Sequence, residues 1–217
     1  MISENLKYIR ASIPQGVTLV AVSKTKPNDA IIEAYETGQR IFGENKVQEL
    51  VSKYESLPKD IEWHMIGHLQ RNKVKYIAPF VHLIHGIDSL RLLEEVDKQA
   101  AKFKRIQRIL LQMHIAEEET KFGLDENELI EILQQLEDFP NVQVLGLMGM
   151  ATFTDSEEKI SKEFYYLKTI YDKYKTDYQF TTLSMGMSGD YQLAIQNGSN
   201  MVRLGSSIFG ERHYQNA

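Results

Sequence analysis

The feature of this sequence that most constrains its fold is a regular alternation of short apolar runs and helical segments. The run from Val17 to Val22 is β-branched and aliphatic, and a helical stretch follows it from Asn28. Such runs predict buried strands, and one strand and one helix recur in about every 25 residues. The predicted strands are 17–23, 40–43, 61–66, 81–85, 106–115, 142–148, 180–184 and 200–204, and the predicted helices are 3–12, 28–37, 44–54, 70–78, 90–103, 126–137, 155–174 and a short one ending at 196.

Eight strand–helix units without a remaining segment predict a (β/α)8 barrel. The length of 217 residues lies near the lower limit for that fold, and 42% hydrophobic and 25% charged residues are ordinary for one domain. We therefore expect a single α/β domain of the TIM-barrel type over residues 1–217, without a C-terminal β domain. The alternative is a doubly wound open sheet, which normally has fewer strands and a glycine-rich turn where this chain has Ser23 to Pro27.

Lys24 stands at the carboxyl end of the first predicted strand. Ligands of α/β proteins bind at the carboxyl ends of the strands. A lysine there is a candidate Schiff-base residue or phosphate ligand, and it is equally a candidate for a solvated strand end. Position alone leaves these three interpretations open.

Two small, glycine-bearing loops follow the last two predicted strands, Gly186–Asp190 and Gly205–Ser207. Barrel enzymes often hold a phosphate with the loops after strands seven and eight, because backbone N–H groups and helix N-termini attract anions. Ser188, Ser206 and Ser207 add hydroxyl donors. The two loops therefore predict a phosphate-binding site.

Arg203 lies inside the last predicted strand, on the same face as Met201 and Gly205. An arginine in an apolar strand needs a partner, which is either a neighbouring carboxylate or an anionic ligand. In a closed barrel the last strand pairs with the first, so we expect Arg203 close to Lys24. Lys26 adds a further positive charge, and like charges lower the pKa of a lysine and favour the neutral amine that Schiff-base chemistry needs.

The composition argues against several classes of function. The net charge of −5 gives no overall field that favours nucleic acid or an anionic membrane. The absence of cysteine excludes disulfides, thiolate nucleophiles and cysteine-based zinc sites. No apolar run reaches membrane-spanning length and the N-terminus has no signal-peptide pattern, so we expect a cytoplasmic protein.

The histidines do not predict a metal site. His64 and His68 have the spacing of helical zinc ligands, but His64 lies near the end of a predicted strand and Gly67 separates the two. His82 and His85 are three residues apart in another predicted strand, so we expect them on opposite faces.

Six ordered motifs give the chain a family resemblance. They are Ala21–Pro27, Phe42–Glu49, Trp63–Lys73, Lys121–Gly123, Ser184–Asp190 and Val202–Gly210, and together they span nearly the whole length. In these motifs the sequence resembles the pyridoxal 5′-phosphate (PLP) homeostasis protein family, whose barrel is similar to the N-terminal domain of alanine racemase. The resemblance implies PLP as the cofactor.

The resemblance also implies roles for individual residues. Lys24 would carry PLP as an internal aldimine. Arg203 would face the pyridine nitrogen, where an arginine can only donate a hydrogen bond and leaves that nitrogen unprotonated. Ser206 stands where the family more often has threonine, and His68 receives no role. The remaining implied contacts are Ser188, Gly205 and Ser206 with the phosphate, and Asn45, Met185 and His64 along the ring.

Two functions from different classes remain open. In the first, a monomeric protein takes up PLP, protects the cell from its aldehyde and passes it on, with apo forms of PLP-dependent enzymes as partners. In the second, the protein is a small PLP-dependent amino-acid racemase, which needs proton donors on both faces of the substrate carbon. A weaker alternative is a barrel that binds another sugar or nucleotide phosphate. Arg203 and the expected lack of a C-terminal β domain favour the carrier.

Overall fold

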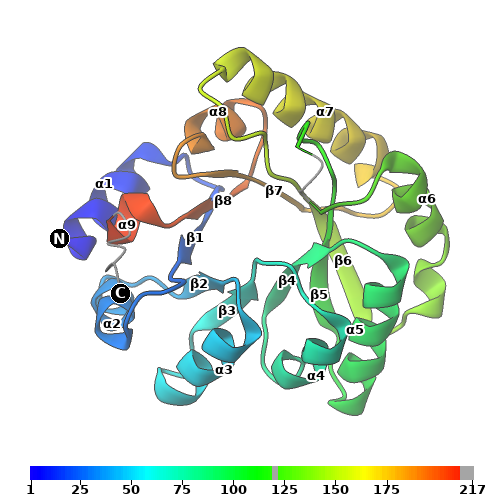
Figure 1. Ribbon diagram of the computed structural model, residues 1–217, viewed down its shortest axis with the longest axis horizontal. Helices are drawn as coiled ribbons and strands as arrows, with labels where there is room; N and C mark the ends of the chain where they lie inside the picture. The colour runs from blue at the N-terminus through cyan, green and yellow to red at the C-terminus, as the bar shows by residue number, and fades with distance from the viewer. Residues whose placement is uncertain (119–121, 211–217) are drawn as a thin grey trace.

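The computed structural model describes residues 1–118 and 122–210, and it confirms the predicted barrel. Eight parallel strands close into a ring in chain order, and helices cover the outside of the ring (Figure 1). Lys121, part of the Lys121–Gly123 motif, lies outside the described ranges. The strands are β1 (Thr18–Val22), β2 (Ile41–Glu44), β3 (Glu62–Met65), β4 (Leu83–Ile87), β5 (Gln107–Gln112), β6 (Val142–Met148), β7 (Thr182–Met187) and β8 (Met201–Leu204).

The helices in these ranges follow the strands as the sequence predicts. None of them combines the length and the apolar character that a membrane span requires. They are α1 (Ile2–Ser12), α2 (Asn28–Glu36), α3 (Val47–Ser56), α4 (Val74–Ile77), α5 (Leu90–Lys102), α6 (Glu126–Gln134), α7 (Glu157–Lys175), α8 (Tyr191–Gln196) and α9 (Ser206–Phe209), with 3-10 turns η1 (Arg71–Lys73) and η2 (Leu136–Asp138).

Strand side chains alternate between two apolar layers. The outer layer lies between strands and helices and holds the largest buried side chains, among them Trp63, Phe42 and Phe164. The inner layer joins side chains of five strands across the barrel, as period-two alternation requires. The interior beneath the strand ends is therefore a packed core, and its buried members are Val20, Leu83, Leu110, Met148 and Met201.

The first and the last strand lie side by side in the closed ring. Val20 of β1 pairs with Arg203 of β8. Outside the ring, Asn5 of α1 donates from Nδ2 to the Ile208 carbonyl of α9 at 2.9 Å. Closure of the sheet thus brings the turn that carries Lys24 next to the loop after β8.

Register shifts interrupt the pairs β4–β5, β5–β6 and β7–β8. The shift in β7 falls between Ser184 and Met187 and contains Gly186 at φ +99°. In β6, Gly146 at φ +151° lies so near the next strand that a Cβ would be 1.9 Å from the Thr182 carbonyl oxygen. Such irregularities change the face to which the following side chains point.

Two element boundaries differ from the sequence expectation. The helix predicted from residue 44 begins at Val47, because Glu44 still pairs in β2. Pairing of β4 begins at Leu83, so His82 precedes the strand. The prediction that His82 and His85 point to opposite faces is wrong, since their ring centroids lie 5.7 and 5.1 Å from that of His64.

Candidate functional site

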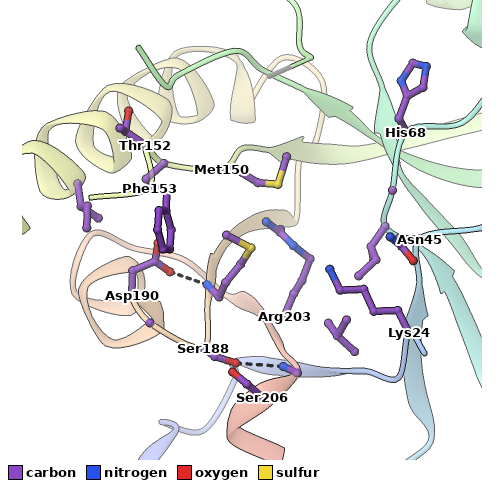
Figure 2. A pocket seen from close by; sticks show the side chains of 18 of the residues that line it. Lys24, Asn45, His68, Met150, Thr152, Phe153, Ser188, Asp190, Arg203 and Ser206 are labelled. Carbon is purple, nitrogen blue, oxygen red and sulfur yellow. Dashed lines mark hydrogen bonds between the residues drawn. The ribbon is translucent and has the colours of Figure 1, made fainter. Parts of the chain in front are cut away.

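A cavity of about 590 Å³ opens at the carboxyl ends of the strands. Figure 2 shows Lys24 and Arg203 extending into it, with Asn45 near Lys24 and with Ser188 and Ser206 close to each other. The structure thus brings together the lysine, the arginine and the two glycine- and serine-bearing loops. The residues predicted from the sequence that line the cavity are Lys24, Asn45, Ser188, Arg203, Gly205 and Ser206.

A buried ion cluster holds the turn that carries Lys24. Lys53 of α3 donates from Nζ to the Ser23 carbonyl, to Glu44 Oε1 and to Glu49 Oε1, each at 2.7 Å. The side chains of Lys53 and Glu44 are only 6% and 0% exposed. Burial raises the pKa of Glu44, and the positive charge of Lys53 acts against that rise. The cluster fixes the carbonyl group immediately before Lys24.

The same cluster holds the residue after Lys24. The Thr25 N–H donates to Glu49 Oε1 at 2.6 Å, and Ser23 Oγ donates to Glu44 Oε1 at 2.5 Å. Thr25 has φ +65°, in the left-handed region that β-branched residues rarely adopt. Because both flanking residues are fixed, Lys24 extends into the cavity from a rigid turn.

Arg203 brings a buried positive charge to the cavity; the residue is 4% exposed. Its Nη1 donates to the Ser184 carbonyl and hydroxyl oxygens at 3.0 and 2.6 Å, and its Nη2 donates to the Gly149 carbonyl at 3.2 Å. Burial lowers the pKa of Arg203 to about 10, and the negative charge of Asp190 acts in the opposite direction. Within residues 1–118 and 122–210 its hydrogen-bond acceptors are neutral oxygens, so the guanidinium favours an anionic or electron-rich ligand.

The two loops at the predicted phosphate end are joined to each other. Ser188 Oγ, after β7, accepts hydrogen bonds from the N–H groups of Gly205 and Ser207, after β8, at 3.1 and 3.4 Å. Lys26 Nζ donates to the Phe209 carbonyl at the end of α9 at 3.0 Å, which ties the Lys24 turn to the same region. Backbone N–H groups that converge on one oxygen atom in this way suit the oxygen of an anion.

Two residues implied as ring contacts do not line the cavity. Met185 is fully buried in the layer between strands and helices, and Met187 lines the cavity instead. Gly186, at φ +99°, lies between them and breaks the strand alternation. His64 is 2% exposed inside the barrel, where its Nδ1 lies 3.0 Å from His85 Nε2.

Residues that sequence reasoning missed complete the cavity. Gln112 ends β5, and Met150 and Phe153 follow β6. His68 lies on the rim, where its ring stacks on Phe122 with the centroids 4.1 Å apart. Gln112 could have been found from its place at a strand end, whereas no local pattern marks Phe153 as a cavity residue.

A chain of buried polar side chains runs from Arg203 into the barrel interior. Ser184 Oγ lies 3.3 Å from His85 Nδ1, and His85 Nε2 lies 3.0 Å from His64 Nδ1. Burial lowers the pKa of His64 to about 3 and the pKa of His85 well below its ordinary value. Both imidazoles are therefore neutral at pH 7, and Arg203 is the charged member of the chain.

Comparisons with known proteins agree with the fold. The family model for the alanine racemase N-terminal domain matches residues 1–213. The pyridoxal phosphate homeostasis protein of Aquifex aeolicus (strain VF5) is 41% identical over 199 residues, covering 90% of this chain and 87% of that protein. The structure of PipY from Synechococcus elongatus PCC7942 with PLP bound has a TM-score of 0.89 and 36% identity, covering 97% of this chain and 100% of that one. Alanine racemase of Clostridium difficile 630, at 13% identity, has a TM-score of 0.77 and covers 100% of this chain and 58% of that one, which supports the fold alone.

Proposed function

The chain belongs to the pyridoxal phosphate homeostasis protein family, and on that premise we propose that it binds PLP through Lys24 and acts as an intracellular PLP carrier. When bound, PLP supplies an aldehyde that condenses with a primary amine. The observation that carries the proposal is the convergence of Lys24, the buried Arg203 and the joined loops after β7 and β8 in one cavity.

The residues at each end of the cavity fit the two ends of PLP. The N–H groups of Gly205 and Ser207 donate to Ser188 Oγ in the structure, and they can donate to a phosphate oxygen that takes the place of this hydroxyl. The hydroxyls of Ser188 and Ser206 are further donors beside the cavity. At the other end, Lys24 offers a primary amine on a turn that the Lys53 cluster holds in place. The cavity volume of about 590 Å³ lies within the range of small-molecule sites.

Arg203 favours the carrier over a racemase. An arginine has donors only, so at the pyridine nitrogen it keeps that nitrogen unprotonated. PLP then withdraws electrons from a bound amino acid less strongly, which weakens proton abstraction at the α-carbon. The Ser184 and Gly149 acceptors fix the position of the guanidinium beside the cavity.

We further propose that a monomer hands PLP to apo forms of PLP-dependent enzymes. Phe153 and Phe122 line the cavity and are 95% and 54% exposed, so they offer apolar surface for a transient contact at its mouth. The Phe153 N–H donates to Glu118 Oε1 at 2.8 Å, which fixes the backbone of this residue beside the cavity.

The attachment is tested by incubating the protein with PLP, recording its visible spectrum, reducing with borohydride and mapping the modified peptide by mass spectrometry. We expect an absorption band and a reduced adduct on Lys24 that Lys24→Ala abolishes. Lys26→Ala is the matched control, because Lys26 also lines the cavity, and it should keep the adduct on Lys24. A protein that shows neither band nor adduct does not bind PLP in this way.

The carrier and racemase functions are separated by a second experiment. The PLP-loaded protein is incubated with L-alanine in D2O, and α-proton exchange is followed by NMR alongside PLP transfer to an apo-enzyme. A carrier transfers PLP and leaves the α-proton in place. Exchange that depends on Lys24 would instead favour the racemase.

A further inference from the structure

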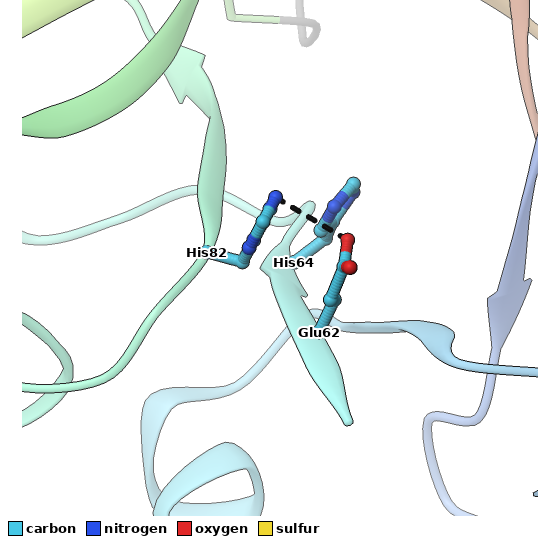
Figure 3. A group of neighbouring side chains, drawn as sticks. All are labelled: Glu62, His64 and His82. Atoms are coloured by element: carbon cyan, nitrogen blue, oxygen red, sulfur yellow. Dashed lines mark ion pairs between the residues drawn. The ribbon is translucent and has the colours of Figure 1, made fainter. Parts of the chain in front are cut away.

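Three side chains that can ligate a metal converge at the end of the barrel opposite the cavity (Figure 3). Glu62 and His64 are two residues apart in β3, so strand alternation places both on the inner face. His82 reaches the same point from the residue before β4. One ligand atom of each residue lies within 4.8 Å of the other two, and His82 Nε2 lies 3.3 Å from Glu62 Oε2.

Two imidazoles and one carboxylate suit Zn²⁺, which often takes three protein ligands and one water molecule in a tetrahedron. Bonds of about 2.0–2.2 Å require neighbouring ligand atoms to lie roughly 3.3 Å apart. Glu62 and His82 already have that separation. His64 has to approach by no more than about 1.5 Å, which a small rotation of side chains supplies.

The surroundings of His64 prepare it for ligation. The residue is 2% exposed, and its Nδ1 lies 3.0 Å from His85 Nε2. In the part of the chain that the structure describes, its Nε2 has no hydrogen-bond partner. Histidine ligands typically bind the metal with one ring nitrogen while a hydrogen bond at the other fixes the ring. The Nε2 atom is therefore available to a metal ion.

We propose that Glu62, His64 and His82 form a binding site for one divalent transition-metal ion of the Zn²⁺ class. The side chains of Glu62 and His82 are 44% and 32% exposed, so an ion can enter from solvent. The site lies at the amino-terminal ends of β3 and β4, away from Lys24 and Arg203. A bound ion there would clamp two neighbouring strands together.

Arg108 is the main competitor of the metal ion. Its Nη1 lies 3.1 Å from His82 Nε2, so its hydrogen bond and its charge both oppose a cation there. The residue is exposed, and its side chain can turn toward solvent. Arg108→Gln should tighten metal binding by about tenfold, because it removes a positive charge close to a divalent ion.

The test uses the 217-residue chain without a histidine tag and without PLP. Zn²⁺ binding is measured by calorimetry, and Co²⁺ serves as a probe because tetrahedral Co²⁺ gives intense visible d–d bands. We expect one ion per chain, at least a tenfold loss of affinity in His82→Asn and in Glu62→Gln, and tighter binding in Arg108→Gln. His68→Asn is the control, since His68 lies on the rim of the PLP cavity.

The outcomes separate the proposal from its competitors. Failure of both the wild type and Arg108→Gln to bind Zn²⁺ would overturn it and leave the three residues as an Arg108-centred polar cluster. Binding that His82→Asn and Glu62→Gln do not weaken would place the ion elsewhere. Attachment of PLP to Lys24 is scored separately and does not enter this result.

Discussion

Replacing Lys53 with methionine should destabilise the protein strongly and loosen the turn that carries Lys24. Lys53 Nζ has three acceptors at 2.7 Å, and the Glu44 side chain beside it is 0% exposed. The substitution leaves Glu44 as a buried carboxylate without its cation. Breaking a buried ion pair from one side costs about 3–5 kcal/mol, which is a large fraction of the roughly 5–15 kcal/mol that stabilises a typical domain.

The pH dependence of this loss follows from Glu44. Burial already raises the pKa of Glu44, and Lys53 is the main group that opposes the rise. Lys53→Met should therefore raise the pKa of Glu44 further. A carboxyl group whose pKa is higher in the folded than in the unfolded protein lowers the free energy of unfolding as the pH rises from the unfolded-state pKa to the folded-state pKa. The difference in the free energy of unfolding between the wild type and Lys53→Met should therefore be largest near pH 8 and should decrease toward pH 5.

The measurement is urea unfolding of both proteins between pH 5 and pH 8, together with the rate of adduct formation on Lys24. Lys162→Met is the matched control, because Lys162 pairs with Glu158 at 2.6 Å where both side chains are more than 70% exposed. Solvent screens that pair, so Lys162→Met should unfold at nearly the same urea concentration as the wild type. The reasoning would be refuted if Lys53→Met lost as little free energy of unfolding as the control, or if its loss increased toward pH 5.

Three further predictions concern the barrel interior and its glycines. Burial lowers the pKa of His64 to about 3 and that of His85 well below its ordinary value, so the protein should lose stability as the pH falls below 6.5, the ordinary pKa of histidine. In urea unfolding, the stability of His85→Gln should depend less steeply on pH than that of the wild type. Gly146→Ala should lower the stability measured by thermal unfolding by about 3 kcal/mol or more, because Gly146 has φ +151° and the new Cβ would lie 1.9 Å from the Thr182 carbonyl oxygen. A variant as stable as the wild type would contradict the register of β6 and β7. Gly67→Ala places a Cβ 2.5 Å from the Asn45 carbonyl oxygen, so it should displace Asn45 and weaken PLP binding measured by absorbance titration, and unchanged affinity would remove Asn45 from the site.

The order of the elements and the main cavity residues follow from local sequence. Apolar runs that end at glycine, proline or a polar turn mark the strands, so Lys24 and Arg203 could be placed at or near strand ends that the closed ring brings together. The glycine and serine content of the two last loops similarly marked Ser188 and Gly205. Asn45 came from the family resemblance and does line the cavity.

The side-chain directions near the irregular strand ends could not be predicted. Met185 and His64 were expected at the cavity, but the bulge at Gly186 turns Met187 there instead, and His64 points into the barrel interior. A bulge depends on the neighbouring strand, which a pattern along one strand does not report. The ion cluster of Lys53 was missed for a similar reason, because it joins a helix to two strands.

The pairing of β1 with β8 has a consequence for the time at which the protein becomes functional. Lys24 and Arg203 are separated by almost the whole chain, yet the cavity needs both. At about 5–20 residues per second, a ribosome takes roughly 10–35 seconds to proceed from one to the other. During that interval the nascent chain already contains Lys24 but neither Arg203 nor the loop after β8. The proposed attachment of PLP to Lys24 in its cavity therefore follows synthesis of β8, and a chain stalled before β8 has Lys24 without the complete cavity around it.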